Sequence, residues 1–322
     1  MSRLKTLGAA RRVTDAREFG KVAVLLGGDS SEREISLLSG NAVLAALKRR
    51  DVDAHAFDPR DNPVQALSER GFDRAWNILH GPGGEDGLIQ GAMEWLGIPY
   101  TGSGVLASAL TMDKLKTKRV AIGAGINAPP YAVLSGEQDI PAVLASVGLP
   151  MMVKPASQGS SVGITKVKTA DALAVAYREA RAVDPIVFAE KFIQGEEFTV
   201  GVLVDAALPS IRIQPATEFY DYQAKYFRDD TQYHCPSGID AAAEARLRQM
   251  ALAAFRATDC SGWGRVDFMR DAASGDFYFI EINTTPGMTD HSLVPKAARE
   301  SGMDFEELVW RVLESSFGRQ RT

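Results

Sequence analysis

Two acids and an amide lie in short apolar segments near the end of the sequence. Asp267 belongs to VDF, and Glu281 and Asn283 belong to FYFIEIN. Both segments are typical of β-strands, and the short stretch DAASGD between them predicts a hairpin turn. Because residues two apart in a strand share a face, Glu281 and Asn283 should lie together, beside Asp267 on the paired strand. Oxygen donors embedded in apolar sequence favour a hard cation such as magnesium over a solvated edge face.

A magnesium ion with so few protein ligands usually completes its shell with phosphate oxygens, which predicts a nucleotide. The sequence has no GxxxxGK[ST] loop. Instead, VKPASQGSSVG (153–163) places Lys154 on a strand, before a loop of glycines and serines that includes Ser160 and Ser161. Backbone and hydroxyl donors in such a loop can hold phosphate. Lys114 lies at another element boundary and would add positive charge, although a solvated surface position is the alternative for any lysine.

Three further residues are weaker candidates when taken singly. Glu190 lies in the apolar segment VFAEKFI (187–193), and Glu197 lies in GEEF (195–198) directly after it. Such a segment suits adenine and ribose, although most such glutamates are surface residues. Arg265 shares a strand face with Asp267. It could stabilise a transferring phosphoryl group or an oxyanion, or it could form a salt bridge to that aspartate.

The elements that would position these residues begin with alternating strands and helices. From Lys21 the sequence predicts a strand, a double glycine and a helix with a capping box of Ser31 and Glu34. One apolar stripe of this helix contains Ile35, Leu38, Ala42 and Ala45. Strands at 52–57 and 74–79 follow, which predicts a parallel sheet.

Two more candidates lie at the ends of these first elements. Glu32 begins the helix, where a carboxylate is favourable in any case. His80 follows a strand at the edge where open α/β sheets bind ligands, and a capping or core histidine fits the local sequence equally well.

The rest of the chain predicts helices at about 105–122, 171–183 and 240–258 and a last one from about Ser292. Strands surround the glycine loop at 153–163, and two more flank Gly195. The period disappears between about 214 and 238, a long polar and aromatic loop of a kind that is usually functional or disordered.

Composition limits the class of protein. A chain of 322 residues with 45% hydrophobic content can bury a sizeable core, and we expect two or three lobes. The net charge of −5 argues against a nucleic-acid binder. Cys235 and Cys260 have no metal-type spacing and are expected to be inert thiols in a reducing compartment. Since no apolar run approaches the roughly 20 residues of a membrane span, we expect a soluble, cytoplasmic protein without a membrane partner. Residues 1–20 are interpreted as a loosely packed extension, not a secretory signal.

Seven segments, in this order, closely resemble D-alanine:D-alanine ligase, a family of the ATP-grasp superfamily: GGDSSEREISLLSG, LHGPGGEDG, YTGSGVLASALTMDKLKTK, VKPASQGSSVG, FYDYQAKY, GWGRVDF and EINTTPGMTDHSLVP. The resemblance covers about Lys21 to Phe317. It implies an α/β fold of three lobes, with ATP between two antiparallel sheets. The implied lobes are 21–104, 105–190 and 191–322, after an extension at 1–20 and with a lid loop at 214–238.

The resemblance also implies a reaction and a homodimer. ATP would phosphorylate the carboxylate of one D-alanine, and the amine of a second would attack the acyl phosphate to give the dipeptide for peptidoglycan precursors. A D-alanine:D-lactate ligase, another carboxylate:amine ligase and a non-catalytic nucleotide-binding protein are the alternatives.

The resemblance assigns metal and substrate roles to particular residues. Asp267, Glu281 and Asn283 would hold two magnesium ions, which manganese can replace. The implied substrate-binding residues include Glu32, which would receive the first ammonium group, and His80. Arg265 and the Gly287 amide would make the oxyanion site, and Ser292 and the Leu293 amide would hold the second carboxylate.

ATP contacts and acceptor choice are implied in the same way. The implied ATP site consists of Lys114, Lys154, Ser160, Ser161, Glu190, Lys191, Phe192, Ile193, Glu197, Phe219, Lys225 and Asn283. Tyr226 would join Ser160 and Glu32 in a hydrogen-bonded set, and a tyrosine there accompanies D-alanine, not D-lactate, as the second substrate. The sequence departs from the family pattern at Pro82, Ala156, Gln158 and Phe192, and none of these changes removes a ligand or a reacting group.

Overall fold

The first sheet is parallel and has β2 (Val22–Leu25) at its centre, between β3 (Ala54–Phe57) and β4 (Arg74–Asn77). This is a computed structural model, and it describes residues 4–6, 11–159, 162–215, 230–289 and 291–321. Every residue of β2 and β4 is buried, as expected for parallel strands that are covered on both faces. The helices of this region are α1 (Arg33–Arg49), α2 (Ala66–Glu69) and α3 (Leu88–Leu96). The predicted parallel sheet is therefore confirmed.

Two details of the predicted first helix were wrong. The N-cap of α1 is Glu32 and it makes no side-chain capping hydrogen bond, so the capping box of Ser31 and Glu34 is absent. The core face is not the predicted stripe but contains Ser36, Ser39, Gly40, Val43, Ala46 and Leu47. Small residues are needed there because the helix lies close to the strand: a Cβ atom on Gly40 would sit 2.4 Å from the Cβ of Leu26.

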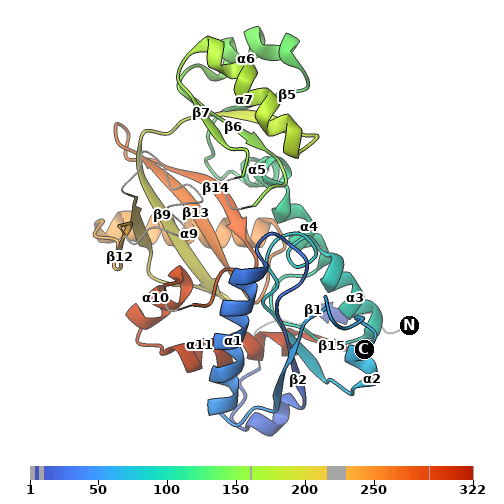
Figure 1. The fold of residues 1–322 in the computed structure, drawn as a ribbon. Coiled ribbons are helices and arrows are strands. Elements are labelled where there is room, and N and C mark those ends of the chain that lie inside the picture. Colours follow the sequence, from blue (N-terminus) through green and yellow to red (C-terminus); the bar gives the residue numbers. More distant parts are fainter. Residues whose placement is uncertain (1–3, 7–10, 160–161, 216–229, 290, 322) are drawn as a thin grey trace.

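A four-stranded antiparallel sheet has the order β5 (Tyr131–Leu134), β8 (Val187–Lys191), β6 (Met151–Pro155) and β7 (Thr165–Val167). Helices α6 (Ile140–Val147) and α7 (Ala170–Val183) cover it at the top of Figure 1. The single helix predicted at about 105–122 is two, α4 (Val105–Met112) and α5 (Lys114–Gly123). The break occurs at Asp113, whose carboxylate accepts from the Lys116 amide at 2.9 Å and so caps α5.

The six-stranded antiparallel sheet lies in the middle of the molecule (Figure 1). Its strands are β12 (Gln232–His234), β11 (Ile211–Gln214), β9 (Gly195–Leu203), β13 (Trp263–Asp271) and β14 (Phe277–Asn283), with β10 (Ala206–Ala207) beside β9. α9 (Ala241–Ala257) packs on one face, while α10 (Leu293–Glu300) and α11 (Phe305–Glu314) end the helical part of the chain. Of the described helices, none is long and apolar enough to cross a membrane.

The predicted hairpin is present, and it contains a β-bulge that was not predicted. Asp267 pairs with Glu281 and Phe268 pairs with Phe279, so Ile280 is the extra residue on β14. Strict alternation would put Glu281 on the same face as Phe279, which is buried in the core. The bulge changes the phase, and Ile280 and Glu281 both line a cavity on the opposite face.

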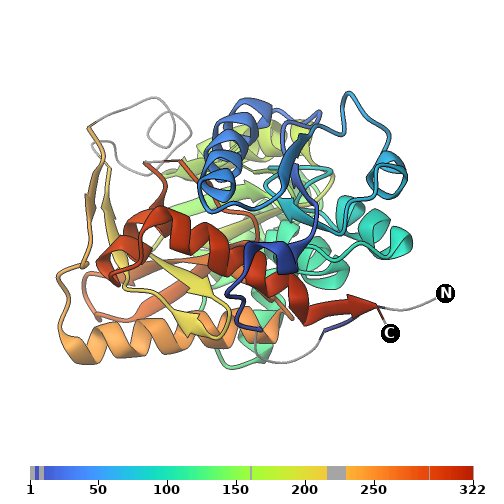
Figure 2. The same cartoon turned by 90° about the horizontal axis from the view of Figure 1, so that it is seen from below.

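The segment before the first sheet is packed, which corrects the loosely packed reading for its described residues 11–20. The short 3-10 helix η1 (Ala16–Phe19) ends in Phe19, which is fully buried with its ring 4.8 Å from that of Trp310. The Val13 amide donates to Glu314 at 2.7 Å. Figure 2 shows η1 lying against α11. Residues Leu4–Thr6 also pair with Arg319–Arg321 as β1 and β15.

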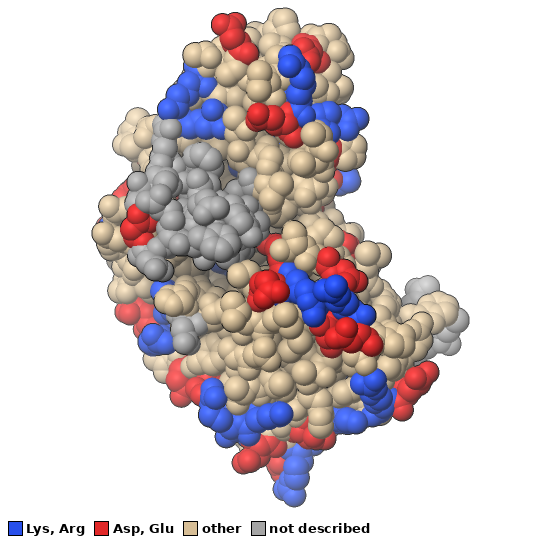
Figure 3. Space-filling view, in the orientation of Figure 1, with Lys and Arg blue, Asp and Glu red and all other residues tan. Residues whose placement is uncertain are grey.

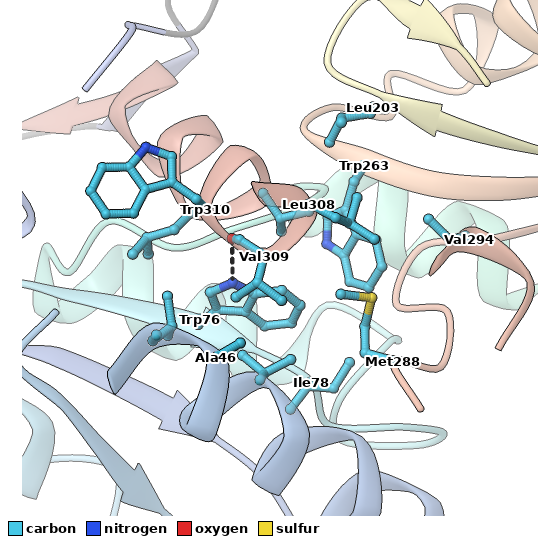
Figure 4. Close-up of a cluster of buried hydrophobic side chains, with 14 of the residues drawn as sticks. Ala46, Trp76, Ile78, Leu203, Trp263, Met288, Val294, Leu308, Val309 and Trp310 are labelled. Atoms are coloured by element: carbon cyan, nitrogen blue, oxygen red, sulfur yellow. Dashed lines mark hydrogen bonds between the residues drawn. The ribbon is translucent and has the colours of Figure 1, made fainter. Parts of the chain in front are cut away.

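One apolar cluster joins the two ends of the chain. In Figure 4 the side chains of Trp76 and Ile78, from the parallel sheet, face Leu308 and Val309 of α11. The Trp76 indole donates to the Val309 carbonyl at 3.3 Å. Trp263 of β13 packs 5.3 Å from Trp76, ring to ring. The last helix and the first sheet therefore share one core.

Phe19→Ala tests this packing. We expect the free energy of unfolding to fall by about 3–5 kcal/mol, because the ring leaves a cavity among buried aromatic residues. Urea denaturation measures it. The control is Val175→Ala, since Val175 is 50% exposed on α7 and should change stability by less than about 0.5 kcal/mol. Equal stability of Phe19→Ala and the native chain would show that residues 11–20 do not support the core.

Candidate active site

Two cavities meet near the centre of the molecule. The first, of about 540 Å³, lies between the four-stranded and six-stranded antiparallel sheets. The second, of about 1010 Å³, lies between α1, the loop after β4, the end of β14 and the start of α10. Lys114, Ile164 and Glu281 line both. A ligand in one cavity would therefore lie beside a ligand in the other. On the face in Figure 3, basic and acidic residues are interspersed around this region.

The first cavity contains most of the described residues that were predicted to bind ATP. They are Lys114, Lys154, Glu190, Lys191, Phe192, Ile193 and Glu197. Backbone pairing of β6 with β8 places Lys154 and Glu190 on neighbouring strands, and their side chains form an ion pair of 2.5 Å. Burial alone would lower the pKa of Lys154, but the Glu190 carboxylate outweighs this and raises it. The cavity has apolar walls, including Met152, and cations at one end, which suits a nucleotide.

The start of α5 forms the end of this cavity where phosphates would bind. The Lys114 ammonium lies 3.1 Å from Glu281 and donates to the Gln158 carbonyl at 2.8 Å. It thus joins the loop after β6 to the hairpin. Asn283 lies on the other side, lining the second cavity and not the first.

The hairpin also assembles the predicted metal-binding residues. Asp267 accepts hydrogen bonds from Thr199 at 2.6 Å and from the Asn283 amide nitrogen at 3.0 Å. Arg265 donates two hydrogen bonds to the same carboxylate, of 2.9 and 2.7 Å. The salt bridge to Asp267, which was the alternative role for Arg265, is therefore present. No group of three or more His, Cys, Asp or Glu with metal-binding geometry occurs among the described residues. Two carboxylates and one amide fit a hard cation whose other ligands are water or phosphate.

The second cavity places Glu32 and His80 together. A Cβ on Gly81 would lie 2.8 Å from a Glu32 carboxylate oxygen, and one on Gly159 would lie 3.1 Å from it, so glycines leave the space that this side chain occupies. His80 is buried and its Nδ1 is 2.8 Å from the Ile78 carbonyl. Its Nε2 has no partner among the described atoms. Burial lowers the pKa of His80, which favours the neutral ring.

Sequence reasoning missed Glu85 in this cavity. Its carboxylate accepts from the Gly81 amide at 2.7 Å and from the backbone of Thr285. Burial and then the neighbouring Glu32 carboxylate raise the pKa of Glu85 to about 8. The available signal was an acid in a glycine-rich loop directly after a strand. Thr199 was also missed, and a lone threonine in a strand gives no such signal.

The far end of the second cavity is built from the loop after β14. Ser292 is the N-cap of α10, and its hydroxyl accepts from the Thr289 amide at 2.9 Å. A Cβ on Gly287 would lie 2.9 Å from the Ser292 hydroxyl oxygen, so only glycine fits without displacement. Leu293 is the first residue of α10. A helix N-terminus of this kind presents amides that can bind a carboxylate.

Five of the predicted site residues lie outside the described residues. They are Ser160, Ser161, Phe219, Lys225 and Tyr226. The predicted lid loop, 214–238, falls largely in the same undescribed part, and only its ends are described.

Comparison with known proteins identifies the family. Residues 121–314 match the model described as "D-ala D-ala ligase C-terminus" and residues 59–103 match "D-ala D-ala ligase N-terminus". "D-alanine--D-alanine ligase B" of Chromobacterium violaceum is 55% identical over 299 residues, 93% of this chain and 98% of the relative. The chain belongs to the D-alanine–D-alanine ligase family. "D-alanine--D-alanine ligase" of Dechloromonas aromatica is 58% identical, over 92% of this chain and 97% of the relative.

Solved structures of the family share the fold. The D-alanine–D-alanine ligase of Bacillus anthracis has a TM-score of 0.81 and 34% identity, covering 92% of this chain and 97% of that one. The same enzyme complexed with ATP has a TM-score of 0.80. The VanG D-Ala:D-Ser ligase of Enterococcus faecalis, 29% identical, also has a TM-score of 0.80 and covers 92% of this chain and 99% of that one. The predicted ATP-grasp architecture is therefore confirmed.

The raised pKa of Glu85 leads us to expect that the free energy of unfolding depends on pH. The folded chain holds the Glu85 proton more tightly than the unfolded chain, where the ordinary pKa is 4.5. The stabilisation is complete below that pH and is lost as the pH rises through about 8. Urea denaturation over this range should show the native chain losing stability relative to Glu85→Gln. The control, Glu34→Gln on the exposed side of α1, should leave the pH dependence unchanged. A constant difference between native and Glu85→Gln at all pH values would contradict the shift.

Proposed function

We propose that this protein joins two D-alanine molecules at the expense of ATP, giving D-alanyl-D-alanine, ADP and phosphate. The observation that carries the proposal is the meeting of the two cavities at Lys114 and Glu281. This junction would put the terminal phosphate of ATP next to a pocket lined by Glu32, Arg265 and Ser292. The family relatives, matched over nearly their whole length, carry the name of this activity.

The first step would be transfer of the γ-phosphoryl group to a carboxylate oxygen of the first D-alanine, with ADP leaving. Glu32 would receive the ammonium group of that D-alanine. Lys114 and Lys154 would stabilise charge on the phosphates, with Lys225 proposed from the undescribed segment. Holding both reactants in place supplies much of the rate enhancement in phosphoryl transfer.

The second step would be attack by the amine of the second D-alanine on the acyl phosphate. Arg265 and the Gly287 amide would stabilise the negative oxygen of the tetrahedral intermediate, which then expels phosphate. Ser292 and the Leu293 amide would hold the carboxylate of the attacking molecule at the start of α10. The predicted lid loop would exclude water, because an acyl phosphate hydrolyses readily.

Magnesium is the proposed cofactor, bound by Asp267, Glu281 and Asn283, and manganese can replace it. When bound, it would neutralise charge on the phosphates of ATP. The oxygen donors of the hairpin and their position beside Lys114 support this proposal.

Three wider proposals depend on the family and on composition. The lobes would be 21–104, 105–190 and 191–322, and the reaction would take place in the cytoplasm, where ATP is abundant. A homodimer is supported by three large apolar side chains that are exposed on α3 and α4. Leu88, Trp95 and Leu106 are 70%, 76% and 66% exposed there, and apolar residues that gather on a surface often mark a protein contact.

The acceptor is the finest part of the proposal. The VanG structure, a D-Ala:D-Ser ligase by its title, has nearly the same fold, so the fold alone does not select the second substrate. Tyr226 supports D-alanine as the acceptor, and a D-alanine:D-lactate ligase is the alternative.

Phosphate release from ATP tests the function directly. With magnesium present, D-alanine should stimulate release. L-alanine should not, because with its ammonium and carboxylate groups held in the same places its methyl group would lie where D-alanine has its α-hydrogen. D-Lactate, added together with D-alanine, should give no ester product by mass spectrometry. Release that does not depend on D-alanine would refute the ligase proposal, and an ester would favour the alternative.

Glu281→Gln tests the metal proposal. The amide keeps the size of the side chain and removes its charge, so we expect turnover to fall by at least about a hundredfold, as when one electrostatic group of an active site is lost. Glu300→Gln, at the exposed end of α10, is the matched control and should retain native turnover. Circular dichroism checks the fold of both. Native turnover in Glu281→Gln would remove this residue from the metal site.

A further inference from the structure

Behind the first cavity lies a lysine that neither the motifs nor the proposed reaction uses. Lys118 is on α5, one turn after Lys114, and its side chain is 1% exposed. Its ammonium group lies 2.8 Å from one carboxylate oxygen of Glu190. The other oxygen of Glu190 is 2.5 Å from Lys154. Lys154 and Glu190 line the cavity, and Lys118 does not.

The three side chains form a buried row of alternating charge. Glu190 is 3% and Lys154 is 10% exposed, so water screens neither contact well. The row carries a net charge of +1, and its cavity end is the Lys154 ammonium. Beside it, Lys114 is already paired with Glu281. A buried lysine is costly unless it is paired. Burial lowers the pKa of Lys118, and the Glu190 carboxylate acts against this, so the charge of +1 counts Lys118 in its charged form.

We infer that Lys118 is a positioning residue that offsets the charge of Glu190 from behind, which leaves the positive charge of Lys154 directed at the phosphates of a nucleotide. The inference rests on the proposed ATP site. Without Lys118, Glu190 and Lys154 would form a neutral pair, and that pair would attract phosphate much less than a net cation does.

A different role for Lys118 would be structural only, filling space between α5 and the strands. The two roles differ in what they predict for ligands with and without phosphate. Loss of charge weakens binding of ATP and leaves adenosine unaffected. Loss of packing that deforms the cavity weakens both.

The main variant is Lys118→Met, which keeps the length of the side chain and removes the charge. Calorimetric titration of the full chain with ATP and magnesium should give a dissociation constant at least about tenfold higher than for the native chain. Binding of adenosine, measured in the same way, should stay within about twofold. Lys116→Met is the matched control: it removes a charge from the same helix at a 61% exposed position, where solvent and salt screen it. Its ATP affinity should be native.

A double variant separates charge from packing. Lys118→Met combined with Glu190→Gln restores the net charge of +1, carried by Lys154 alone. Because Glu190 lines the cavity, its replacement also alters contacts with the nucleoside, so the quantity compared is the ratio of ATP affinity to adenosine affinity in the same variant. If charge is what Lys118 supplies, this ratio is higher in the double variant than in Lys118→Met and within about threefold of the native ratio. The comparison with the native ratio remains decisive even if Lys118→Met alone fails to fold, because the cation left in the double variant, Lys154, lines the cavity.

Three results would overturn the inference: native ATP affinity in Lys118→Met, equal weakening of ATP and adenosine, or a ratio of ATP to adenosine affinity in the double variant that is no higher than in Lys118→Met. Failure of the native chain to bind ATP is a different result. It would overturn the proposed function, and this inference with it.

Discussion

The site depends on the opposite chemical character of the two faces of the β13–β14 hairpin. Val266 and Phe268 on one face are buried under α9, whereas Arg265 and Asp267 on the other face the cavities. Regular alternation would have carried Glu281 to the apolar face together with Phe279. The extra residue at Ile280 prevents that, and it does so without an unpaired carboxylate in the core, where the cost of burial would be several kcal/mol. A single irregularity in one strand thus lets a stable core and a charged site share the same two strands.

The lysines around the site avoid the cost of burying a charge because each is paired with a carboxylate. Three lysines around the site have a carboxylate partner from another element: Lys114 of α5 meets Glu281 of β14, and both Lys118 of α5 and Lys154 of β6 meet Glu190 of β8. Through α5, these pairs link the six-stranded sheet to the four-stranded sheet. A buried lysine or glutamate that would be unfavourable alone is therefore tolerated in a pair. The lysines are also already in place where the phosphates of a polyanionic ligand could replace the glutamates as their partners.

Local sequence patterns predict some features of the fold and of the site, and they miss others. The hairpin and the shared face of Glu281 and Asn283 follow from a short turn and from alternation, which are properties of neighbouring residues. The pairing of Asp267 with Glu281 depends on the bulge at Ile280. That bulge is set by register with β13, which no single strand encodes. The apolar stripe of α1 was assigned wrongly because a substrate cavity and a core both require apolar side chains: Ile35, Leu38 and Ala42 line the second cavity. Lys118 has the sequence context of a surface lysine. It is buried because α5 packs against β14 and places Leu115 and Lys118 beside Phe188 and Glu190 of β8.

The core shared by the first sheet and the last helix bears on how the chain is made. Val22, Val24 and Trp76 are translated early, and α1 covers part of the face they form, but Leu308, Val309 and Leu313 of α11 pack on the same cluster and emerge from the ribosome much later. Part of this face therefore stays uncovered until α11 is made, whereas most domains can close as units from the N-terminal end. Until then, that part is an apolar surface open to chaperones or to other nascent chains. A chain truncated before α11 would lack more than that helix, because part of its first-made sheet would have no cover.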